Sequence, residues 1–435
     1  MRDLAAEVNE PLEREAPALF RSLSPLGRRI YFPPDIPSQA AEARGKGMNA
    51  TIGQITDGRG GAVRLPELVA AFGELPGRDL DAALLYSPVE GMAEVRQLWR
   101  KWQRRSAPAA APSSLPLVTV GLSHGLSLVA DLFGGEGKAV AIPSPFWGNY
   151  RQAFAVRTGA RVLSAPTYVD GRYNPRSISD ALAGLPEGEP AVAMLNIPSN
   201  PGGYSPDREE RRATIAALIE EAGRRPLVVV CDDAYAGLVF EPDVPRESVF
   251  WDLAAAVGAH PNLVPVKIDG ATKEFSFFGG RVGFLTFALE PDSAAAKSME
   301  SKVKMLVRST VGSPVSASQV ILLQALRKEG IGEEVEKVRL LLEGRYRSLK
   351  AALGGVDPRL LTVLPFNSGC FALVEIPEGL GIDAEKARRH LLEHHDTGLI
   401  SIAPRYLRIA HCSVDEAALP ELVRRLEQGV RELAD

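Results

Sequence analysis

The chain has 435 residues, of which 45% are hydrophobic and 24% are charged, and its net charge is −4 at pH 7. These are ordinary globular proportions, so the length predicts one large folded domain with a smaller one, and not long disorder. The weak net charge does not favour binding to a nucleic acid or to an anionic membrane. The sequence contains no run of about 18 apolar residues, so it predicts no membrane span.

Cysteine usage points to a reducing compartment. Cys231, Cys370 and Cys412 lie far apart and form no CxxC pair, which predicts neither a disulfide framework nor a zinc site. The first twenty residues mix acids and bases and lack the apolar core of a signal peptide. We therefore expect a cytoplasmic protein without a metal, whose partners are small molecules.

The first predicted element is an amphipathic helix over residues 1 to 25, after which Pro33, Pro34 and Pro37 break the chain. A helix is predicted over 90–105, and the Ala/Pro/Ser run 106–116 predicts a surface connection. Seven short apolar runs then alternate with helical stretches, as in a parallel sheet that helices cover. The runs are 117–120, 138–142, 161–164, 191–196, 227–231, 263–268 and 283–287.

The last third of the chain has a different pattern. Two helical stretches, one after Ser298 and one over 339–353, precede strands near 371–375 and 406–411 that alternate with helices over 384–394 and 415–433. The predicted fold class is α/β, a three-layer large domain with a mostly parallel seven-stranded sheet, plus a smaller α+β domain. We place an N-terminal arm and part of the small domain at 1–60, the large domain at 61–315 and the small C-terminal domain at 316–435.

Polar residues follow four of the predicted strands, at 121–125, 196–203, 232–235 and 269–281. In an open α/β sheet, ligands bind beyond the carboxyl ends of the strands. Each polar segment alone has an ordinary explanation, because a strand-end aspartate is commonly a helix cap, Asn-Pro-Gly a turn and a loop lysine a solvated charge. Their order along the chain is more specific.

That order resembles the motif order of the fold-type I aminotransferases, the aspartate aminotransferase superfamily of class I/II. SNPGG, DDAY, TKEFSFFGGRVG and LRIAHC resemble the family's NPTG, D-x-A-Y, SxxK…R-x-G and R-I/L motifs, and the resemblance spans roughly residues 52–412. The matched residues are Asn200, Asp232, Tyr235, Lys273, Arg281 and Arg408. The resemblance implies the pyridoxal-phosphate-dependent transferase fold, with pyridoxal 5'-phosphate as cofactor and amino acids and 2-oxo acids as substrates.

The resemblance also implies the chemical roles of the matched residues. Lys273 would form the Schiff base with the cofactor aldehyde and then shuttle the α-proton of the substrate. Asp232 would keep the pyridine nitrogen protonated, so that the ring accepts electrons. Tyr235 and Asn200 would hydrogen-bond the phenolic oxygen of the ring. Lys273, Asp232 and Tyr235 are thus the expected catalytic residues.

Further cofactor contacts follow from the same resemblance. Arg281 and the backbone of Leu122 and Ser123 would bind the phosphate, and Trp147, in PSPFWGNY, would stack on the ring. Tyr86 resembles a tyrosine that the family lends to the phosphate of the neighbouring subunit, which implies a homodimer with shared active sites. Packing is the alternative role for Tyr86.

One position departs from the family pattern. The family often places a serine that contacts the phosphate three residues before the lysine, and this position is Gly270 here. The contact is then lost or supplied by Thr272 or Ser276, between which the sequence does not decide.

Substrate binding is expected at three residues. Arg408 resembles the arginine that grips the α-carboxylate, and Gly53 resembles a glycine near that carboxylate, although a flexible turn is an equal explanation. Arg308 lies where dicarboxylate-specific members carry a second arginine from the other subunit, which would favour an acidic amino acid. Support of the dimer interface is the alternative role for Arg308.

The function expected from the sequence is a ping-pong aminotransferase. It would move the amino group between an L-amino acid, with aspartate or another acidic one as candidate, and a 2-oxo acid such as 2-oxoglutarate. A lyase or decarboxylase of the same fold and a non-catalytic cofactor-binding regulator are the alternatives. His124 is left without a role, and His394 and His395 are interpreted as a solvated face and not as a metal site.

Overall fold

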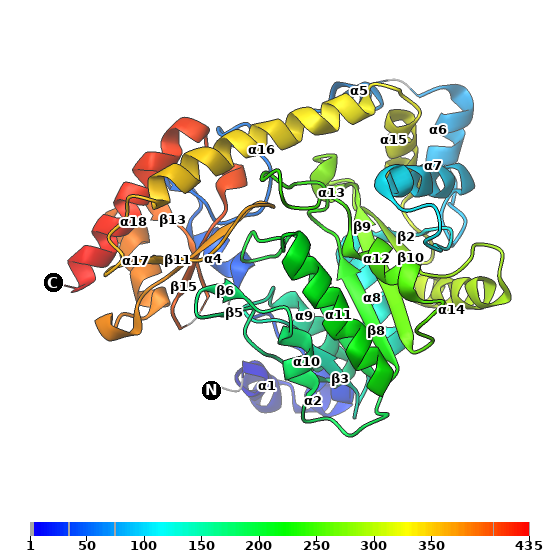
Figure 1. The fold of residues 1–435 in the computed structure, drawn as a ribbon, viewed down its shortest axis with the longest axis horizontal. Coiled ribbons are helices and arrows are strands. Elements are labelled where there is room, and N and C mark those ends of the chain that lie inside the picture. Colours follow the sequence, from blue (N-terminus) through cyan, green and yellow to red (C-terminus); the bar gives the residue numbers. More distant parts are fainter. Residues whose placement is uncertain (1–3, 34, 74, 403, 435) are drawn as a thin grey trace.

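A seven-stranded sheet between two helical layers forms the centre of the computed structural model, which describes residues 4–33, 35–73, 75–402 and 404–434 (Figure 1). The strand order is β2-β10-β9-β8-β7-β3-β4, and only β10 runs antiparallel to its neighbours. The strands are β2 (Leu117–Val120), β3 (Ala139–Ala141), β4 (Arg161–Leu163), β7 (Ala191–Asn196), β8 (Leu227–Asp232), β9 (Leu263–Gly270) and β10 (Val282–Phe287). The predicted α/β class and the mostly parallel sheet are confirmed.

Helices cover both faces of this sheet because its strands are apolar on both sides. Ala193 and Val229 face the layer of α10 (Ser177–Leu182), α11 (Arg208–Arg224) and α12 (Val249–Ala256). Their neighbours Val192 and Val230 point the other way, toward α8 (Gly121–Phe133) and α14 (Ala294–Thr310). Burial of both faces leaves the strand ends as the place for polar chemistry.

A second, antiparallel sheet belongs to the C-terminal part of the chain. Its order is β11 (Thr362–Val363), β12 (Ala372–Glu375), β15 (Tyr406–Ile409) and β14 (Ile400–Ile402). Around it lie α16 (Ile331–Leu353), α17 (Ala384–His394) and α18 (Leu419–Ala434). The long α16 runs from the large domain to this smaller unit (Figure 1). The two units meet beside the carboxyl ends of the large sheet, because Asn367 and Ser368 donate to the Gly203 carbonyl just after β7.

Two contacts bear on where the units divide. β1 (Met48–Asn49) pairs with β13 (Thr397–Gly398), which attaches the N-terminal segment to the smaller unit. α15 (Ser316–Leu326) packs against α5 (Pro66–Ala70), α6 (Gly77–Leu84) and α7 (Ala93–Gln103). The division at residues 60 and 315 stays a prediction.

Two local predictions differ from the structure. In place of the single helix expected over residues 1 to 25, the structure has α1 (Leu4–Glu15), α2 (Pro17–Ser22) and α3 (Pro25–Arg29). The helix is divided because Pro17 and Pro25 each start a new one. Residues 1–3 of the expected helix lie outside the described residues. The run 106–116 is partly buried, because Ser114 exchanges hydrogen bonds with Phe287 at the sheet edge. α4 (Ile36–Glu42) follows the arm. Among the described helices, none has both the length and the apolar character needed to cross a bilayer.

Candidate active site

One cavity lies beyond the carboxyl ends of β2, β7, β8 and β9, and it gathers most of the residues singled out in the sequence. Eight of them line it: Leu122, Ser123, Trp147, Asn200, Asp232, Tyr235, Lys273 and Arg281. Four further residues complete the lining: Tyr150, Asn196, Ala234 and Thr272. Asn196 and Asp232 end β7 and β8, and the other residues come from segments that follow a strand of the large sheet. The exception is Arg281, which immediately precedes the antiparallel β10 and so reaches the same edge. The adjacency of these strands therefore brings distant motifs together.

Two lysines near this edge have opposite surroundings, and of these Lys267 is buried and Lys273 is half-buried. Lys267, on β9, is bonded to Asp233 and lies 3.3 Å from a carboxylate oxygen of Asp269, and these charges raise its pKa. Lys273, on α13 (Ala271–Glu274), has no carboxylate partner among the described residues, and its Nζ lies 4.9 Å from the ring centroid of Phe278. Burial lowers the pKa of Lys273. Lys267 is therefore held charged, whereas Lys273 has the surroundings of an amine that can be neutral.

Asp232 is a buried carboxylate held in place by three hydrogen bonds. Its Oδ2 accepts from the Tyr150 hydroxyl at 2.6 Å, its Oδ1 accepts from the Ala234 amide at 3.1 Å, and its backbone carbonyl accepts from Asn196 at 3.0 Å. Burial raises the pKa of Asp232 to about 6, although the bonds from Tyr150 and Ala234 oppose that rise. A cationic ring nitrogen facing this carboxylate would keep it ionised.

The start of α8 and Arg281 together form an anion site. Gly121 has a φ of +73°, and a Cβ there would lie 2.1 Å from Nη2 of Arg281, so only glycine lets the guanidinium reach the first turn of the helix. Leu122 and Ser123 follow in that turn, whose free amides and helix dipole favour a negative charge. These residues fit a phosphate group.

The structure also explains the glycine at position 270. A Cβ there would lie 2.5 Å from the Val282 carbonyl oxygen, so a serine does not fit between β9 and β10. Thr272 lines the cavity, and its buried hydroxyl has no partner among the described residues. The Ser276 hydroxyl is also buried without a partner, but Ser276 is not part of the cavity lining. The geometry therefore favours Thr272 as the substitute.

Arg408, on β15 of the smaller unit, is 1% exposed. Its Nη1 donates to Asn200 at 3.0 Å and its Nη2 to the Thr51 carbonyl at 2.6 Å, while its Nε has no partner. Burial lowers the pKa of Arg408 to about 10. The guanidinium lies 4.3 Å above the ring of Phe371, and a Cβ at Gly53 would lie 2.4 Å from that ring. Gly53 thus makes room for the ring under Arg408, and the free Nε is available to a carboxylate.

Arg408, Gly53 and Ser276 do not line this cavity, and neither do three other residues considered in the sequence. Tyr86 is 98% exposed, and Arg308 is exposed on α14. Neither lines the cavity of its own chain, so their predicted contacts require a second chain. His124 accepts from the Val120 amide at 3.1 Å and lies 3.2 Å from the Thr310 hydroxyl, which gives it a local structural role at the start of α8.

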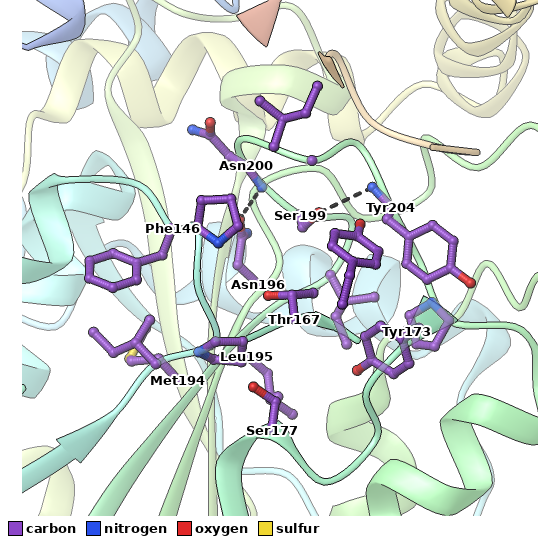
Figure 2. Close-up of a pocket in the computed structure, with 18 of the residues that line it drawn as sticks. Phe146, Thr167, Tyr173, Ser177, Met194, Leu195, Asn196, Ser199, Asn200 and Tyr204 are labelled. Carbon is purple, nitrogen blue, oxygen red and sulfur yellow. Dashed lines mark hydrogen bonds between the residues drawn. The ribbon is translucent and has the colours of Figure 1, made fainter. Parts of the chain in front are cut away.

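A smaller aromatic cavity adjoins the site and shares Tyr150, Asn196 and Asn200 with it. Figure 2 shows Phe146 on one side of it, and Tyr173 and Tyr204 on the other. Tyr150 was not predicted, although it follows Trp147 by three residues in the same motif and its ring lies edge-on to Trp147, with centroids 5.6 Å apart. Its position about one helical turn after Trp147 was the signal that could have identified Tyr150.

We expect Tyr150→Phe to lower kcat about tenfold or more, because a hydrogen bond to a charged group contributes about 1.5–3 kcal/mol. The change removes only the hydroxyl that donates to Asp232. The Tyr150→Phe change should also shift the pH at which the absorption of the bound cofactor changes. Tyr168→Phe is the matched control, because Tyr168 lines only the aromatic cavity and its hydroxyl donates to Pro365. Equal effects of the two changes would contradict a role for Tyr150 through Asp232.

Comparison with known proteins agrees with this geometry. The family model "Aminotransferase class I and II" matches residues 46–426. A 2-aminoadipate transaminase of Thermus thermophilus is 29% identical over 81% of this chain and 83% of its own, and an aspartate aminotransferase of Bacillus subtilis is 24% identical over 79% and 83%.

Solved structures share the fold. The crystal structure of an alpha-aminoadipate aminotransferase from Thermus thermophilus, complexed with N-(5'-phosphopyridoxyl)-L-leucine, has a TM-score of 0.76 at 23% identity and covers 95% of this chain and 98% of its own. An aminotransferase from Anaerococcus prevotii has a TM-score of 0.79 at 20% identity, with coverages of 94% and 98%. The fold, the cavity and the family match together lead to one conclusion: the chain belongs to the class I and II aminotransferases, a family of pyridoxal-phosphate-dependent enzymes.

Proposed function

We propose that this enzyme transfers the amino group of an acidic L-amino acid to a 2-oxo acid such as 2-oxoglutarate, in a ping-pong cycle on the cavity described above. The observation that carries the proposal is that one cavity holds both the half-buried amine of Lys273, which forms no ion pair among the described residues, and the buried carboxylate of Asp232. The relatives named 2-aminoadipate transaminase and aspartate aminotransferase support an acidic donor.

Pyridoxal phosphate would supply an aldehyde for the amino group and a ring that accepts electrons from the substrate. Lys273 would hold the aldehyde carbon and, once displaced by substrate, take the α-proton on its Nζ. Asp232, fixed by Tyr150, would keep a proton on the ring nitrogen. Tyr235 would donate a hydrogen bond to the phenolic oxygen, since burial raises its pKa and keeps its hydroxyl protonated.

Binding and orientation would fall to the remaining residues. Arg281, Thr272 and the first amides of α8 would hold the phosphate, and the Trp147 ring would lie against the cofactor ring. Arg408 would bind the α-carboxylate of the substrate, because its free Nε and its buried, partly satisfied guanidinium gain a charge-assisted partner there. The substrate is thus placed with its α-carbon toward Lys273.

A homodimer is part of the proposal. Leu84 is 77%, Leu85 67% and Tyr86 98% exposed, which is unusual for consecutive apolar residues on a monomer. The Ser316 hydroxyl donates to the Leu85 carbonyl, so the exposed Val315 lies beside this run. A second copy would cover the patch and bring Tyr86 to the neighbouring phosphate site. We also propose a cytoplasmic location, since the three cysteines are free and buried.

Arg308 is assigned to the side-chain carboxylate of the substrate bound by the neighbouring subunit. No carboxylate of the described residues pairs with it, and it lies two positions before Thr310, which contacts His124 beside the phosphate site. We expect Arg308→Ala to lower kcat/KM for acidic amino acids about 10²-fold and to leave neutral ones nearly unchanged. Steady-state assays with aspartate, 2-aminoadipate and leucine measure this selectivity.

Arg408→Ala is the matched comparison, because it should raise KM for every amino acid. An equal loss on acidic and neutral donors in Arg308→Ala would show that Arg308 does not select the substrate. A screen of purified enzyme against donors and acceptors, with the released 2-oxo acid measured, tests the proposed reaction. Consumption of the amino acid without transfer to an acceptor would favour a lyase of the same fold.

A further inference from the structure

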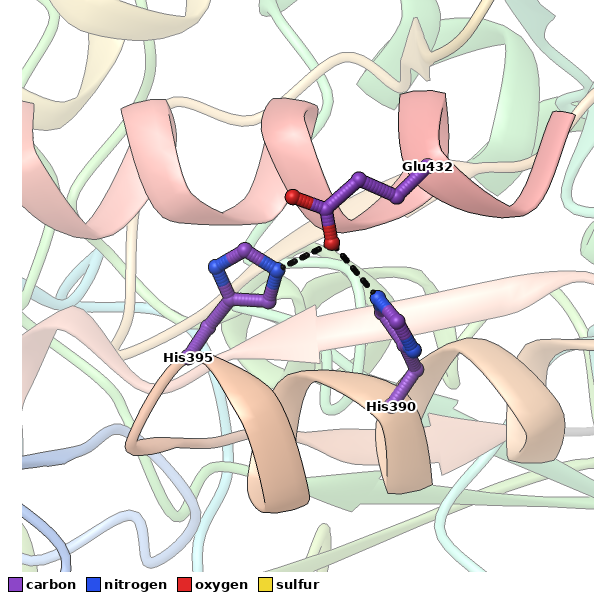
Figure 3. Close-up of side chains that lie close together, drawn as sticks. All are labelled: His390, His395 and Glu432. Carbon is purple, nitrogen blue, oxygen red and sulfur yellow. Dashed lines mark hydrogen bonds and ion pairs between the residues drawn. The ribbon is translucent and has the colours of Figure 1, made fainter. Parts of the chain in front are cut away.

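A second cluster of chemically active side chains lies far from the cavity, between α17 and α18. His390 and His395 each place Nε2 2.8 Å from the same oxygen, Oε2 of Glu432. Figure 3 shows both imidazole rings, one on α17 and one just after its end, aimed at the carboxylate on α18. His394 is 60% exposed, as expected from the sequence, but His395 is only 9% exposed, so its interpretation as solvated was wrong.

The packing of the two helices fixes this cluster. Gly429 lets α18 approach α17 closely, because a Cβ there would lie 2.6 Å from Leu391 and 3.3 Å from the His395 ring. Glu432 follows Gly429 by three residues and therefore lies on the same face of α18. Gln428 donates to the other carboxylate oxygen of Glu432 at 2.9 Å and thereby orients it. The close helix packing and the bond from Gln428 therefore hold two half-buried histidines against a carboxylate that is 40% exposed.

The donor set is that of a transition-metal site. Two imidazole nitrogens and one carboxylate oxygen are ligands that zinc accepts, and the three atoms lie within 4.8 Å of one another. Ligand atoms around a tetrahedral zinc ion lie about 3.3 Å apart, slightly more than the 2.8 Å contacts seen here. The side chain of Glu432 is 40% exposed and can retreat by the difference.

We propose that His390, His395 and Glu432 bind one zinc ion, with water as the fourth ligand, and that the ion fastens α17 to α18. The orienting hydrogen bond from Gln428 supports the proposal, because carboxylates that bind metals are typically held by such outer partners. The site is independent of the amino-transfer chemistry.

Zinc titration of the tag-free holoenzyme, followed by calorimetry, tests the proposal. We expect one zinc ion per chain and a rise of a few degrees in the unfolding temperature at saturating zinc, since a ligand of the folded state stabilises it. Magnesium, which prefers oxygen ligands, should give neither effect. Cobalt in place of zinc should give the absorption of a four-coordinate ion.

Glu432→Gln and His390→Ala should each weaken zinc binding by at least about tenfold, since even outer partners of a metal site contribute 10–100-fold. Glu432→Gln keeps the size of a half-exposed side chain and should not disturb folding. It therefore tests the site even if the His390→Ala variant does not fold. His394→Ala is the matched control and should bind zinc as the wild type does. Absence of binding at this stoichiometry, or binding that survives Glu432→Gln and His390→Ala, would overturn the proposal and leave a hydrogen-bonded triad.

Discussion

Lys273→Ala is expected to lower kcat by at least about 10⁴-fold, the upper end of what a positioned general base contributes. The variant loses both the amine that holds the cofactor and the base that moves the α-proton. It should still fold, because Lys273 is half-buried and forms no ion pair among the described residues, so its removal leaves no charged partner behind. Single-turnover kinetics of the variant with bound cofactor measure the loss.

Lys297→Ala, a change at an exposed lysine of α14, is the control for this experiment. Lys267 is unsuitable, because its loss would leave Asp233 and Asp269 buried without a cation and would cost about 3–5 kcal/mol of stability. Retention of more than about 1% of wild-type activity in Lys273→Ala would be incompatible with its role as base.

Asp232→Asn should lower kcat about 10³-fold, which corresponds to about 4 kcal/mol of transition-state stabilisation. The amide keeps the shape but has a single acceptor oxygen, so it can accept only one of the two hydrogen bonds from Tyr150 and Ala234. The change therefore removes the negative charge together with one of these bonds. Stopped-flow absorbance of the first half-reaction reports the effect directly. A loss of less than tenfold would mean that the charge of Asp232 is not needed.

The same variant has a pH signature without cofactor. Burial raises the pKa of Asp232 to about 6 from an ordinary value of 3.8, so the folded chain holds this proton more tightly than the unfolded chain does. The protonated carboxyl group therefore stabilises the folded state at low pH. That contribution is lost as the pH rises through about 6. Thermal unfolding of the cofactor-free wild type should therefore lose stability relative to Asp232→Asn between about pH 4 and 6, and parallel curves would contradict the buried ionisation.

Much of the large domain could be predicted because its strands are short, apolar on both faces and separated by helices. The predicted runs 117–120 and 191–196 match β2 and β7 in full, and the polar residues after the strands meet at one sheet edge. The first helix was predicted too long because Pro17 and Pro25 reset the helix while the apolar periodicity continued. Ser114 was misplaced on the surface because small polar residues can be buried when the backbone of a strand pairs with them.

In the site, motif order predicted residues that would contact cofactor or substrate themselves, but it did not predict residues that would act through another residue. Tyr150 became visible only through its contact with Asp232, and the preference for Thr272 required the steric limit at Gly270. The roles of Tyr86 and Arg308 depend on atoms of a second chain, so neither the sequence nor a single subunit decides them. These two assignments stay predictions.

The position of the covalent bond between cofactor and protein is the most direct test of the central claim. Reduction of the holoenzyme with borohydride, followed by proteolysis and mass spectrometry, locates the lysine that carries the phosphopyridoxyl group. The half-buried amine of Lys273, which forms no ion pair among the described residues, predicts that this residue alone is labelled, and that prior addition of an amino acid protects it. Labelling of Lys267 or of a surface lysine, or no label at a full complement of cofactor, would contradict the account.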